Sequence, residues 1–203
     1  MVKKAFYVLL VCVCGIGHCR AEPRVSHLPA RLSGSSMNIT FEVGTTWHTV
    51  HGEVKDLTGR VWFESPKDPG SIRATLTIPV IALDTGSESR DEEMRNSMNA
   101  ELFPSIQVEM PRISPSCDVR TLTVESACTY ATKGTITIRD VTLPLELGGS
   151  VHRDAHGALL VDGSAHLDWS AFGVKDPSIL IAQVNEEVNI AFTMTLPEIK
   201  KSL

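Results

Sequence analysis

Histidine is the residue type in this chain that most readily binds a metal ion or transfers a proton near neutral pH. His152 and His156 have the four-residue spacing of a metal-binding pair on a helix, but the sequence HRDAHG around them is typical of a turn. His48 and His51 lie three residues apart in a strand-like segment, where they would point to opposite faces. No HExxH, GxSxG or paired-carboxylate motif accompanies them. We therefore predict no catalytic residue, no metal site and no cofactor, and expect a protein that is not an enzyme.

The N-terminal segment has the three-part organisation of a secretory signal peptide. A basic MVKK is followed by the apolar AFYVLLVCVCGIG and by CRA, which predicts a signal peptide over residues 1–21 with cleavage after Ala21. The apolar run is short for a membrane-spanning helix, so a retained anchor is the less favoured alternative. Lipoprotein anchoring at Cys19 is a second alternative, which His18 disfavours because a small residue is usual there. The segment predicts a periplasmic or otherwise exported protein.

Cys117 and Cys128 are the two cysteines that remain after such cleavage. An even number of cysteines in an exported protein predicts a disulfide, because the compartment is oxidising. This disulfide would close a loop of about a dozen residues and contribute roughly 3 kcal/mol in the chain-entropy model. The spacing is not CxxC, which argues against a redox pair, and two thiols alone are few for a metal site.

The composition is that of a folded domain without a basic surplus. The chain has 203 residues, of which 42% are hydrophobic, and a formal net charge of −5. This predicts no nucleic-acid partner, because proteins that bind nucleic acid carry a basic patch. Residues 22–36 are polar and interrupted by proline and glycine, so we expect an N-terminal arm or linker there. The remaining residues, 37–203, are enough for one domain with a sizeable core.

Apolar and polar side chains alternate along this domain, which is the pattern of β-strands. In the first such segment Met37, Ile39, Phe41 and Val43 share one face. Segments with strand character lie around residues 37–43, 47–64, 71–80, 106–110, 119–131, 134–147, 158–169 and 188–196. About eight strands predict an all-β fold, and both a sandwich and an antiparallel barrel would bury their apolar faces. The alternation does not choose between the two.

The charged segment DTGSESRDEEMRNS interrupts the strands and is typical of a short amphipathic helix. Ser89 and Glu92 have the spacing of a capping box at its start. Met94, Met98 and Leu102 recur every four residues and would form one apolar stripe. The stripe either closes one end of the core or lines the mouth of a ligand cavity, for which flexible methionine side chains are suited.

Five segments, taken in order, resemble the YceI-like family of exported lipocalin-like proteins that bind polyisoprenoids or other long-chain lipids. They are ITFEVGTTWHTVHGEVKDLTGRVWFE, LDTGSESRDEEMR, LFPSIQVEM, KGTITIRDVTLPLEL and LDWSAFGV. The resemblance extends from about Asn38 to Leu196. The sequence SMNAEL stands where the family often has an aromatic-rich segment, and Arg139 and Asp140 stand where it commonly has His-Gly. The first of these departures would alter the width of a cavity.

The resemblance implies an antiparallel eight-stranded lipocalin-like barrel, with the amphipathic helix in a strand crossover and a long apolar cavity along the barrel axis. It implies a long-chain apolar lipid, isoprenoid or fatty-acyl, as the partner, held without catalysis. Combined with the alternation, it assigns ligand-binding roles to Phe41, Val43, Ile78, Val80, Ile106, Val108, Ile190 and Phe192, with Met94 and Met98 from the helix. Head-group contacts are expected from Asp84 and Arg90, and rim positions for Trp47, Trp62 and Trp169.

Two alternatives remain open from the sequence. Each apolar side chain could serve packing alone, in which case the barrel is solid and the protein is an interaction module that acts through its surface. Asp84 and Arg90 could fasten the crossover segment without meeting a ligand. A homodimer through an edge strand or the methionine-rich helix is also compatible with the sequence.

Overall fold

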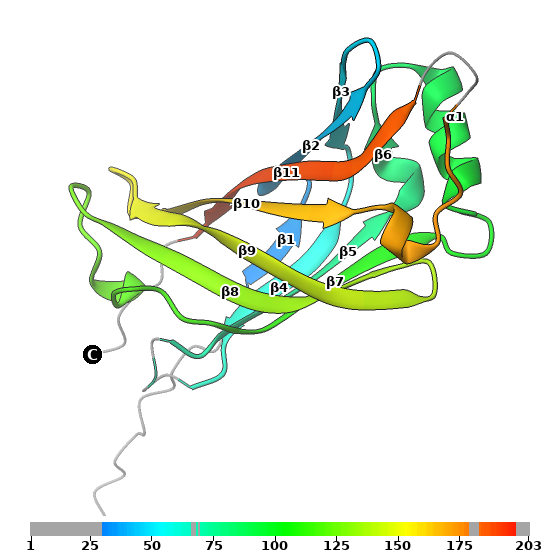
Figure 1. The fold of residues 1–203 in the computed structure, drawn as a ribbon. Helices are drawn as coiled ribbons and strands as arrows, with labels where there is room; N and C mark the ends of the chain where they lie inside the picture. Colours follow the sequence, from blue (N-terminus) through cyan, green and yellow to red (C-terminus); the bar gives the residue numbers. More distant parts are fainter. Residues whose placement is uncertain (1–29, 66–67, 69, 179–182, 198–203) are drawn as a thin grey trace, which may run out of the picture.

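The computed structural model describes residues 30–65, 68, 70–178 and 183–197, and the strands of this part form one antiparallel sheet that curls on itself (Figure 1). The strands are β1 Ala30–Ser33, β2 Met37–Thr45, β3 Thr49–Val54, β4 Thr58–Phe63, β5 Ile72–Pro79, β6 Leu83–Asp84, β7 Ser105–Ile113, β8 Ala127–Ile138, β9 Val141–Arg153, β10 Leu159–Asp168 and β11 Val184–Leu196. The helices are α1 Glu88–Ser97 and the short 3-10 helices η1 Val80–Ala82, η2 Val119–Thr121 and η3 Ser170–Phe172. The predicted signal peptide, residues 1–21, and residues 22–29 of the predicted arm lie outside the described residues.

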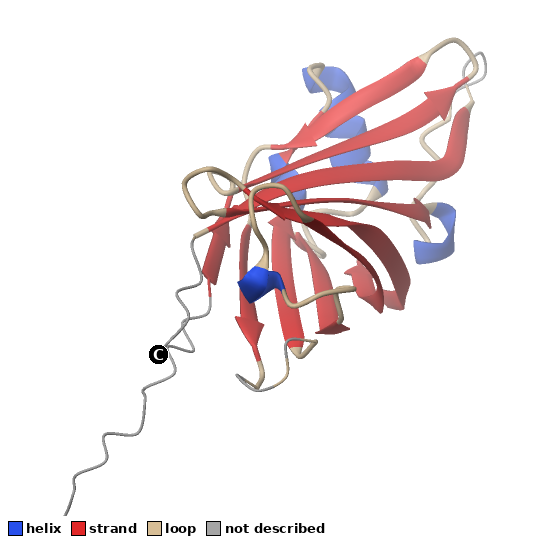
Figure 2. Ribbon diagram, turned by 90° about the vertical axis from the view of Figure 1, so that its left-hand side faces the viewer, coloured by secondary structure: helices blue, strands red, loops and turns tan. Residues whose placement is uncertain are grey.

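The strands follow the order β1-β4-β5-β7-β8-β9-β10-β11-β2-β3-β6 across the sheet, and all neighbours are antiparallel. β3 and β4 follow one another in the chain without pairing, because the chain turns a corner at residues 55–57. Leu57 is fully buried at this corner, and the Lys55 backbone N–H donates to the carbonyl oxygen of Ala82. The curl leaves a common interior on the concave side of the sheet (Figure 2). The predicted all-β, antiparallel, lipocalin-like barrel fold is confirmed.

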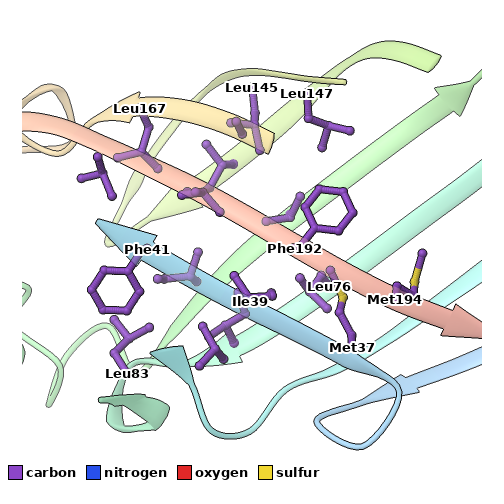
Figure 3. Close-up of a pocket in the computed structure, with 18 of the residues that line it drawn as sticks. Met37, Ile39, Phe41, Leu76, Leu83, Leu145, Leu147, Leu167, Phe192 and Met194 are labelled. Atoms are coloured by element: carbon purple, nitrogen blue, oxygen red, sulfur yellow. The ribbon is translucent and has the colours of Figure 1, made fainter. Parts of the chain in front are cut away.

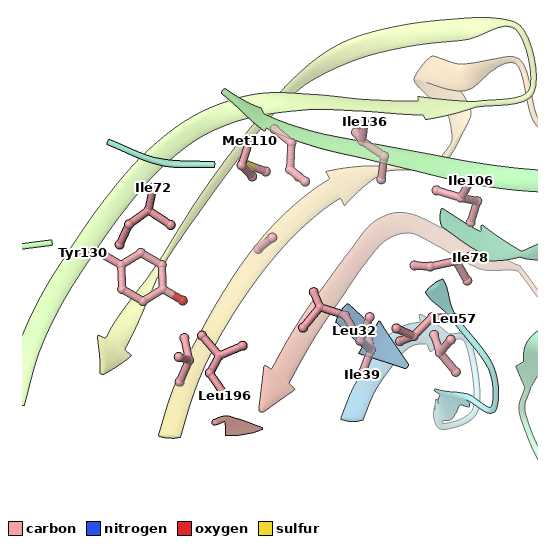
Figure 4. Packing of buried hydrophobic residues seen from close by; sticks show 14 of the residues in the cluster. Leu32, Ile39, Leu57, Ile72, Ile78, Ile106, Met110, Tyr130, Ile136 and Leu196 are labelled. Atoms are coloured by element: carbon pink, nitrogen blue, oxygen red, sulfur yellow. The ribbon is translucent and has the colours of Figure 1, made fainter. Parts of the chain in front are cut away.

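Alternation along the strands divides the side chains between this interior and the outer surface. In β11, Val188, Ile190 and Phe192 line the interior, whereas Asn189 and Thr193 are exposed. Inward-facing residues of different strands meet in one apolar cluster, in which Figure 4 labels Leu32 of β1, Ile78 of β5 and Leu196 of β11, among others. Burial of such side chains contributes about 25 cal/mol per Å² of apolar surface and is the main stabilising term of the fold.

The described part has eleven strands, whereas the sequence predicts about eight. β1 lies within the segment 22–36 that was expected to be an arm, and it pairs with β4. The corner at residues 55–57 divides the predicted strand segment 47–64 into β3 and β4. β6 has only two residues, too few for a period of two to be recognised in the sequence.

β8 runs unbroken from Ala127 to Ile138, so the break that the sequence indicates between residues 131 and 134 is wrong. The turn to β9 comes later, at Arg139, whose φ is 58°. Gly134 serves close packing: a Cβ atom there would lie 2.2 Å from the carbonyl oxygen of Glu109 on β7.

The crossover helix α1 is present between β6 and β7, but it starts differently from the prediction. Its N-cap residue is Ser87, which makes no side-chain cap hydrogen bond, so the predicted capping box of Ser89 and Glu92 is wrong. The carboxylate of Asp91 is buried and accepts hydrogen bonds from both the backbone N–H and the hydroxyl of Thr85. These bonds, rather than a side-chain cap, fix the residues that precede the helix.

α1 also ends earlier than the methionine stripe suggests. Its last residue is Ser97, so Leu102 lies in the turns that follow and is 66% exposed. The apolar stripe is reduced to Met94 and Met98. Within the described residues, no helix is long and apolar enough to cross a membrane.

A disulfide joins Cys117 and Cys128, with Cα atoms 5.5 Å apart, as the sequence predicts. It ties the first residues of β8 to the segment that carries η2, at the opposite end of the sheet from α1 (Figure 1). The Arg153 guanidinium fastens the same segment by donating to the carbonyl oxygens of Leu122 and Val119, at 2.8 and 3.2 Å. This end of the barrel is therefore held by a covalent bond and by hydrogen bonds.

Candidate ligand-binding cavity

The interior of the curled sheet contains a cavity of about 1140 Å³ (Figure 3). Every strand contributes at least one side chain to its wall. Typical small-molecule sites have roughly 300–1,000 Å³, so this cavity is slightly larger than that range. The interior is hollow, which does not fit the alternative of a barrel filled by its own side chains.

The wall of the cavity is almost entirely apolar. Among the described residues, the charged side chains that line it are Arg31, Arg90 and Glu93. Leucine, isoleucine, valine, methionine and phenylalanine make up most of the remainder, and ten of the lining residues are labelled in Figure 3. A surface of this kind has little to offer a polar ligand and favours hydrocarbon by the hydrophobic effect.

Methionine is concentrated in this wall. Apart from Met1, every methionine of the sequence lines the cavity; these are Met37, Met94, Met98, Met110 and Met194. Met37 and Met194 are cross-strand partners on β2 and β11, and Figure 3 shows both among the lining side chains. Because the thioether side chain is unbranched and flexible, the wall can adapt to ligands of different shape.

Most of the side chains predicted to bind a ligand border the cavity. Those that line it are Phe41, Val43, Ile78, Met94, Met98, Ile106, Val108, Ile190, Phe192 and Arg90. Their strands place them there by the period of two on which the prediction was based. The prediction leaves out the lining residues of β8, β9 and β10, such as Tyr130, Leu147 and Leu167, although the same alternation marks them.

Val80 and Asp84 do not border the cavity, so their predicted ligand contacts are corrected. Val80 is only 1% exposed and lies in η1, after β5 has ended at Pro79, so the strand alternation no longer applies to it. The Asp84 carboxylate accepts a hydrogen bond from the backbone N–H of Gly86 at 2.7 Å and lies 3.4 Å from the Lys55 ammonium. The hydrogen bond from Gly86 is the main cause that lowers the pKa of the Asp84 carboxyl group. Through these two contacts Asp84 holds the crossover segment in place.

The wall becomes polar where α1 borders it. One face of the helix turns Arg90, Glu93, Met94, Ser97 and Met98 to the cavity, in the spacing of a single helical face. Its N-terminal members, Arg90 and Glu93, are exposed, whereas Ser97 and Met98 near its end are buried. We call this part of the wall the α1 rim.

Arg90 is held in place at the α1 rim by one neighbour, Thr85. Its Nε donates to the Thr85 hydroxyl at 2.8 Å, and its Nη2 donates to the Thr85 carbonyl oxygen at 2.7 Å. Thr85 itself lines the cavity. The predicted head-group residue thus borders the cavity at the α1 rim, where two hydrogen bonds orient it.

The three tryptophans divide between the cavity and the outer surface. Trp62 and Trp169 line the cavity, and the Trp169 indole donates to the carbonyl oxygen of Asn185 at 2.7 Å. Trp47 does not line it and is 71% exposed. Two of the three predicted rim positions therefore border the cavity.

Tyr130 is a polar residue of the cavity wall that the sequence analysis does not single out. It is 7% exposed, and its hydroxyl donates to the carbonyl oxygen of Asp162 at 2.9 Å. Burial, and secondarily the charge of Asp162, raise the pKa of this phenol well above its ordinary value. The phenol is therefore protonated at neutral pH, and its hydroxyl has a hydrogen-bond partner within the protein.

The histidines are dispersed over the barrel. His152 lies on β9 with its Nε2 3.8 Å from the Asp162 carboxylate, and His156 lies in the following turn, as predicted. His51 contacts Glu42 on the neighbouring strand. Within the part of the chain that the structure describes, no three potential metal-ligating side chains gather.

A single curled antiparallel sheet around one large apolar cavity defines the class of lipocalin-like barrels. The model of the YceI-like domain family matches residues 31–196, and the chain belongs to this family. No curated protein matches the chain.

Solved structures share the fold. Burkholderia cenocepacia BcnA has a TM-score of 0.64 and 20% identity, over 79% of this chain and 96% of BcnA. A polyisoprenoid binding domain from Saccharophagus degradans, implicated in plant cell wall breakdown, has a TM-score of 0.66 and 14% identity, over 83% of this chain and 98% of that domain. The Campylobacter jejuni YceI protein has a TM-score of 0.55 and 18% identity, over 75% of this chain and 86% of that protein. At these identities the likeness shows the fold.

Proposed function

We propose that this protein is an exported lipid carrier that holds a polyisoprenoid or another long-chain lipid in the barrel cavity and catalyses no reaction. The observation that carries the proposal is the cavity of about 1140 Å³ with its almost wholly apolar wall. Membership of the YceI-like family and the fold shared with a polyisoprenoid binding domain support the same class of ligand.

The hydrophobic effect supplies enough free energy for such binding without any charged contact. Burial of hydrocarbon contributes about 0.8 kcal/mol per CH₂ group, so ten buried carbons contribute roughly 8 kcal/mol before the ordering of the chain is subtracted. The length of chain that fits inside would set the affinity. The α1 rim, with Arg90 and Glu93, would meet the end of the lipid that faces water.

Export rests on the signal-peptide pattern of residues 1–21. The Cys117–Cys128 disulfide supports an oxidising compartment such as the periplasm. A long-chain lipid has little solubility in such an aqueous space. A barrel that is polar outside and apolar inside would shield it between membranes or enzymes.

Native mass spectrometry of the mature protein from an exporting host tests the proposal. A bound adduct of several hundred daltons that extracts into organic solvent as an isoprenoid or acyl lipid is expected. If the protein is bare as isolated, it is then incubated with isoprenoid and fatty-acyl lipids. A protein that stays bare after this incubation would contradict the proposal and leave the surface-acting interaction module as the better description.

A further inference from the structure

Two of the phenylalanine rings that line the cavity, both labelled in Figure 3, lie over glycines of the neighbouring strand. Phe41 on β2 is the cross-strand partner of Gly52 on β3, and Phe192 on β11 is the partner of Gly163 on β10. A Cβ atom at Gly52 would lie 2.2 Å from Cζ of Phe41, and one at Gly163 would lie 2.6 Å from Cζ of Phe192. Both distances are far below van der Waals contact, so each ring occupies the space that a side chain at the glycine would need.

Both glycines belong to the inner face of the sheet. Side chains two positions apart on a strand point to the same face. The residues two positions before and after each glycine all line the cavity; these are Val50, Val54, Val161 and Ala165. The wall therefore lacks a side chain at Gly52 and at Gly163, and the phenylalanine of the next strand covers the gap.

The two phenylalanines can be reached from the lumen. Both face inward and line the cavity, yet each is only partly buried. Their neighbours along the strands, such as Glu42 and Ala191, lie on the outer face. The accessible part of each inward-facing ring therefore borders the lumen, where a ligand would contact it.

A methyl group at either glycine would displace side chains and not the backbone. The three atoms nearest to a Cβ at Gly52 all belong to the ring of Phe41. At Gly163 they are two ring atoms of Phe192 and the hydroxyl oxygen of Tyr130. An alanine at these positions is thus compatible with the strand, provided that the ring moves.

The open space beside each ring is the lumen of the cavity. With a methyl group beneath it, a ring would have to tilt away from the wall, because a side chain has only a few staggered positions. Tilted rings would narrow the lumen, and an overfilled apolar site binds bulky groups poorly. A methyl-branched chain has a larger cross-section than a straight chain and would lose more affinity.

We propose that Gly52 and Gly163 are specificity-determining residues that set the cross-section of the chain accepted by the cavity. Because they let Phe41 and Phe192 lie along the wall, the lumen stays wide enough for methyl-branched hydrocarbon as well as for straight chains. This inference rests on the proposed function, because it concerns the shape of the lipid that the cavity would hold.

The test uses two fatty acids whose main chains have equal length: phytanic acid, which carries methyl branches, and palmitic acid, which is straight. Delipidated wild type, Gly52→Ala and Gly163→Ala are compared by displacement of a fluorescent fatty-acyl probe. The affinity of the probe itself is first determined for each protein, and the melting temperature of each is measured without ligand.

Gly44→Ala is the matched control. Gly44 lies on β2 between the lining residues Val43 and Thr45, so it belongs to the outer face. A Cβ atom there would also displace a side chain, because it would lie 2.5 Å from the side-chain nitrogen of Asn185, which is exposed. The control therefore makes a similar substitution without affecting the lumen.

The wild type and Gly44→Ala are expected to bind phytanic acid at least as tightly as palmitic acid. Gly52→Ala and Gly163→Ala are expected to lose about 10- to 100-fold in affinity for phytanic acid and much less for palmitic acid. Their melting temperatures should stay close to that of the wild type. Removal of the ring should restore the width, so Gly52→Ala/Phe41→Leu and Gly163→Ala/Phe192→Leu are expected to regain most of the affinity for phytanic acid.

Any of four results would overturn the inference while leaving the lipid carrier intact: equal losses for the two acids, the same loss in Gly44→Ala, no recovery in the double variants, or alanine variants that do not fold. The last result would mean that the backbone gives way and not the ring. Failure of the wild type to bind either acid or the probe would instead contradict the proposed function, and the inference with it.

Discussion

Asp91 and Thr85 are joined by two hydrogen bonds: one carboxylate oxygen of Asp91 accepts from the Thr85 backbone N–H at 2.9 Å and from the Thr85 hydroxyl at 2.5 Å. The same hydroxyl accepts from Arg90 Nε at 2.8 Å. A buried carboxylate therefore orients, through Thr85, the arginine at the α1 rim. These hydrogen bonds tie the start of the crossover helix to the residues after β6, and Met94 and Met98 pack its end against the core.

Replacement of Asp91 by alanine should weaken the attachment of α1. We expect the free energy of unfolding to fall by about 2–3 kcal/mol, because Thr85 loses a charged acceptor in a buried position. Urea denaturation measures the change. Glu92→Ala is the matched control on the same helix; its side chain is exposed, and its effect should stay within about 0.5 kcal/mol. Equal falls in the free energy of unfolding for Asp91→Ala and Glu92→Ala would contradict this role of the Asp91 carboxylate.

A phenylalanine in place of Ala74 should shorten the chain length that the protein accepts. Ala74 lies on β5 and lines the cavity, so the ring would take up space that a lipid would fill. We expect affinity for long acyl chains to fall at least tenfold and affinity for short chains to change less, as measured by probe displacement with fatty acids of graded length. Ala191→Phe is the control, because Ala191 is exposed on β11 and does not line the cavity. Loss of binding by both variants would show that the cavity wall is not the site.

The sequence predicts the inward faces of the strands well because the period of two depends only on the backbone. Ile190 and Phe192 are examples, and both lie where the alternation puts them. Alternation could not choose between sandwich and barrel, since both bury one face of each strand. That choice came from the family resemblance.

The features that the sequence does not predict depend on contacts between distant segments. The corner that separates β3 from β4 packs Leu57 fully into the core, and no local pattern marks it. Gly134 suggests a turn, yet it is required by the close approach of β7. The position of the Phe192 ring over Gly163 could not be foreseen, because it depends on the pairing of β10 with β11.

The Cys117–Cys128 disulfide should stabilise the end of the barrel opposite α1. Replacement of both cysteines by alanine should lower the free energy of unfolding by about 3 kcal/mol, mainly because the unfolded chain gains freedom. Chemical denaturation of the oxidised wild type and the double variant measures this. Intact mass of the non-reduced protein provides an independent check, since the bonded form lacks two hydrogen atoms. Free thiols in protein from an exporting host would contradict the disulfide.

Tyr130 allows a direct test of the interior environment, because it is the only tyrosine outside residues 1–21. Burial raises the pKa of its phenol above the ordinary value of 10.0. In the mature protein the tyrosinate absorbance should therefore appear at clearly higher pH in the native state than in urea. A native titration near the ordinary value would show that the phenol is open to water.

The same shift predicts how stability depends on alkaline pH. Because the folded protein keeps the proton that the unfolded chain releases, the stabilisation from Tyr130 is complete below the ordinary pKa and is lost as the pH rises above it. The free energy of unfolding should then fall by up to about 1.4 kcal/mol per pH unit from this group alone. Tyr130→Phe removes the hydrogen bond to Asp162 and should be less stable at neutral pH, but its stability should decline less steeply. Urea denaturation of both proteins between about pH 9 and 11 compares the slopes, and parallel slopes would mean that Tyr130 does not titrate on unfolding in this range.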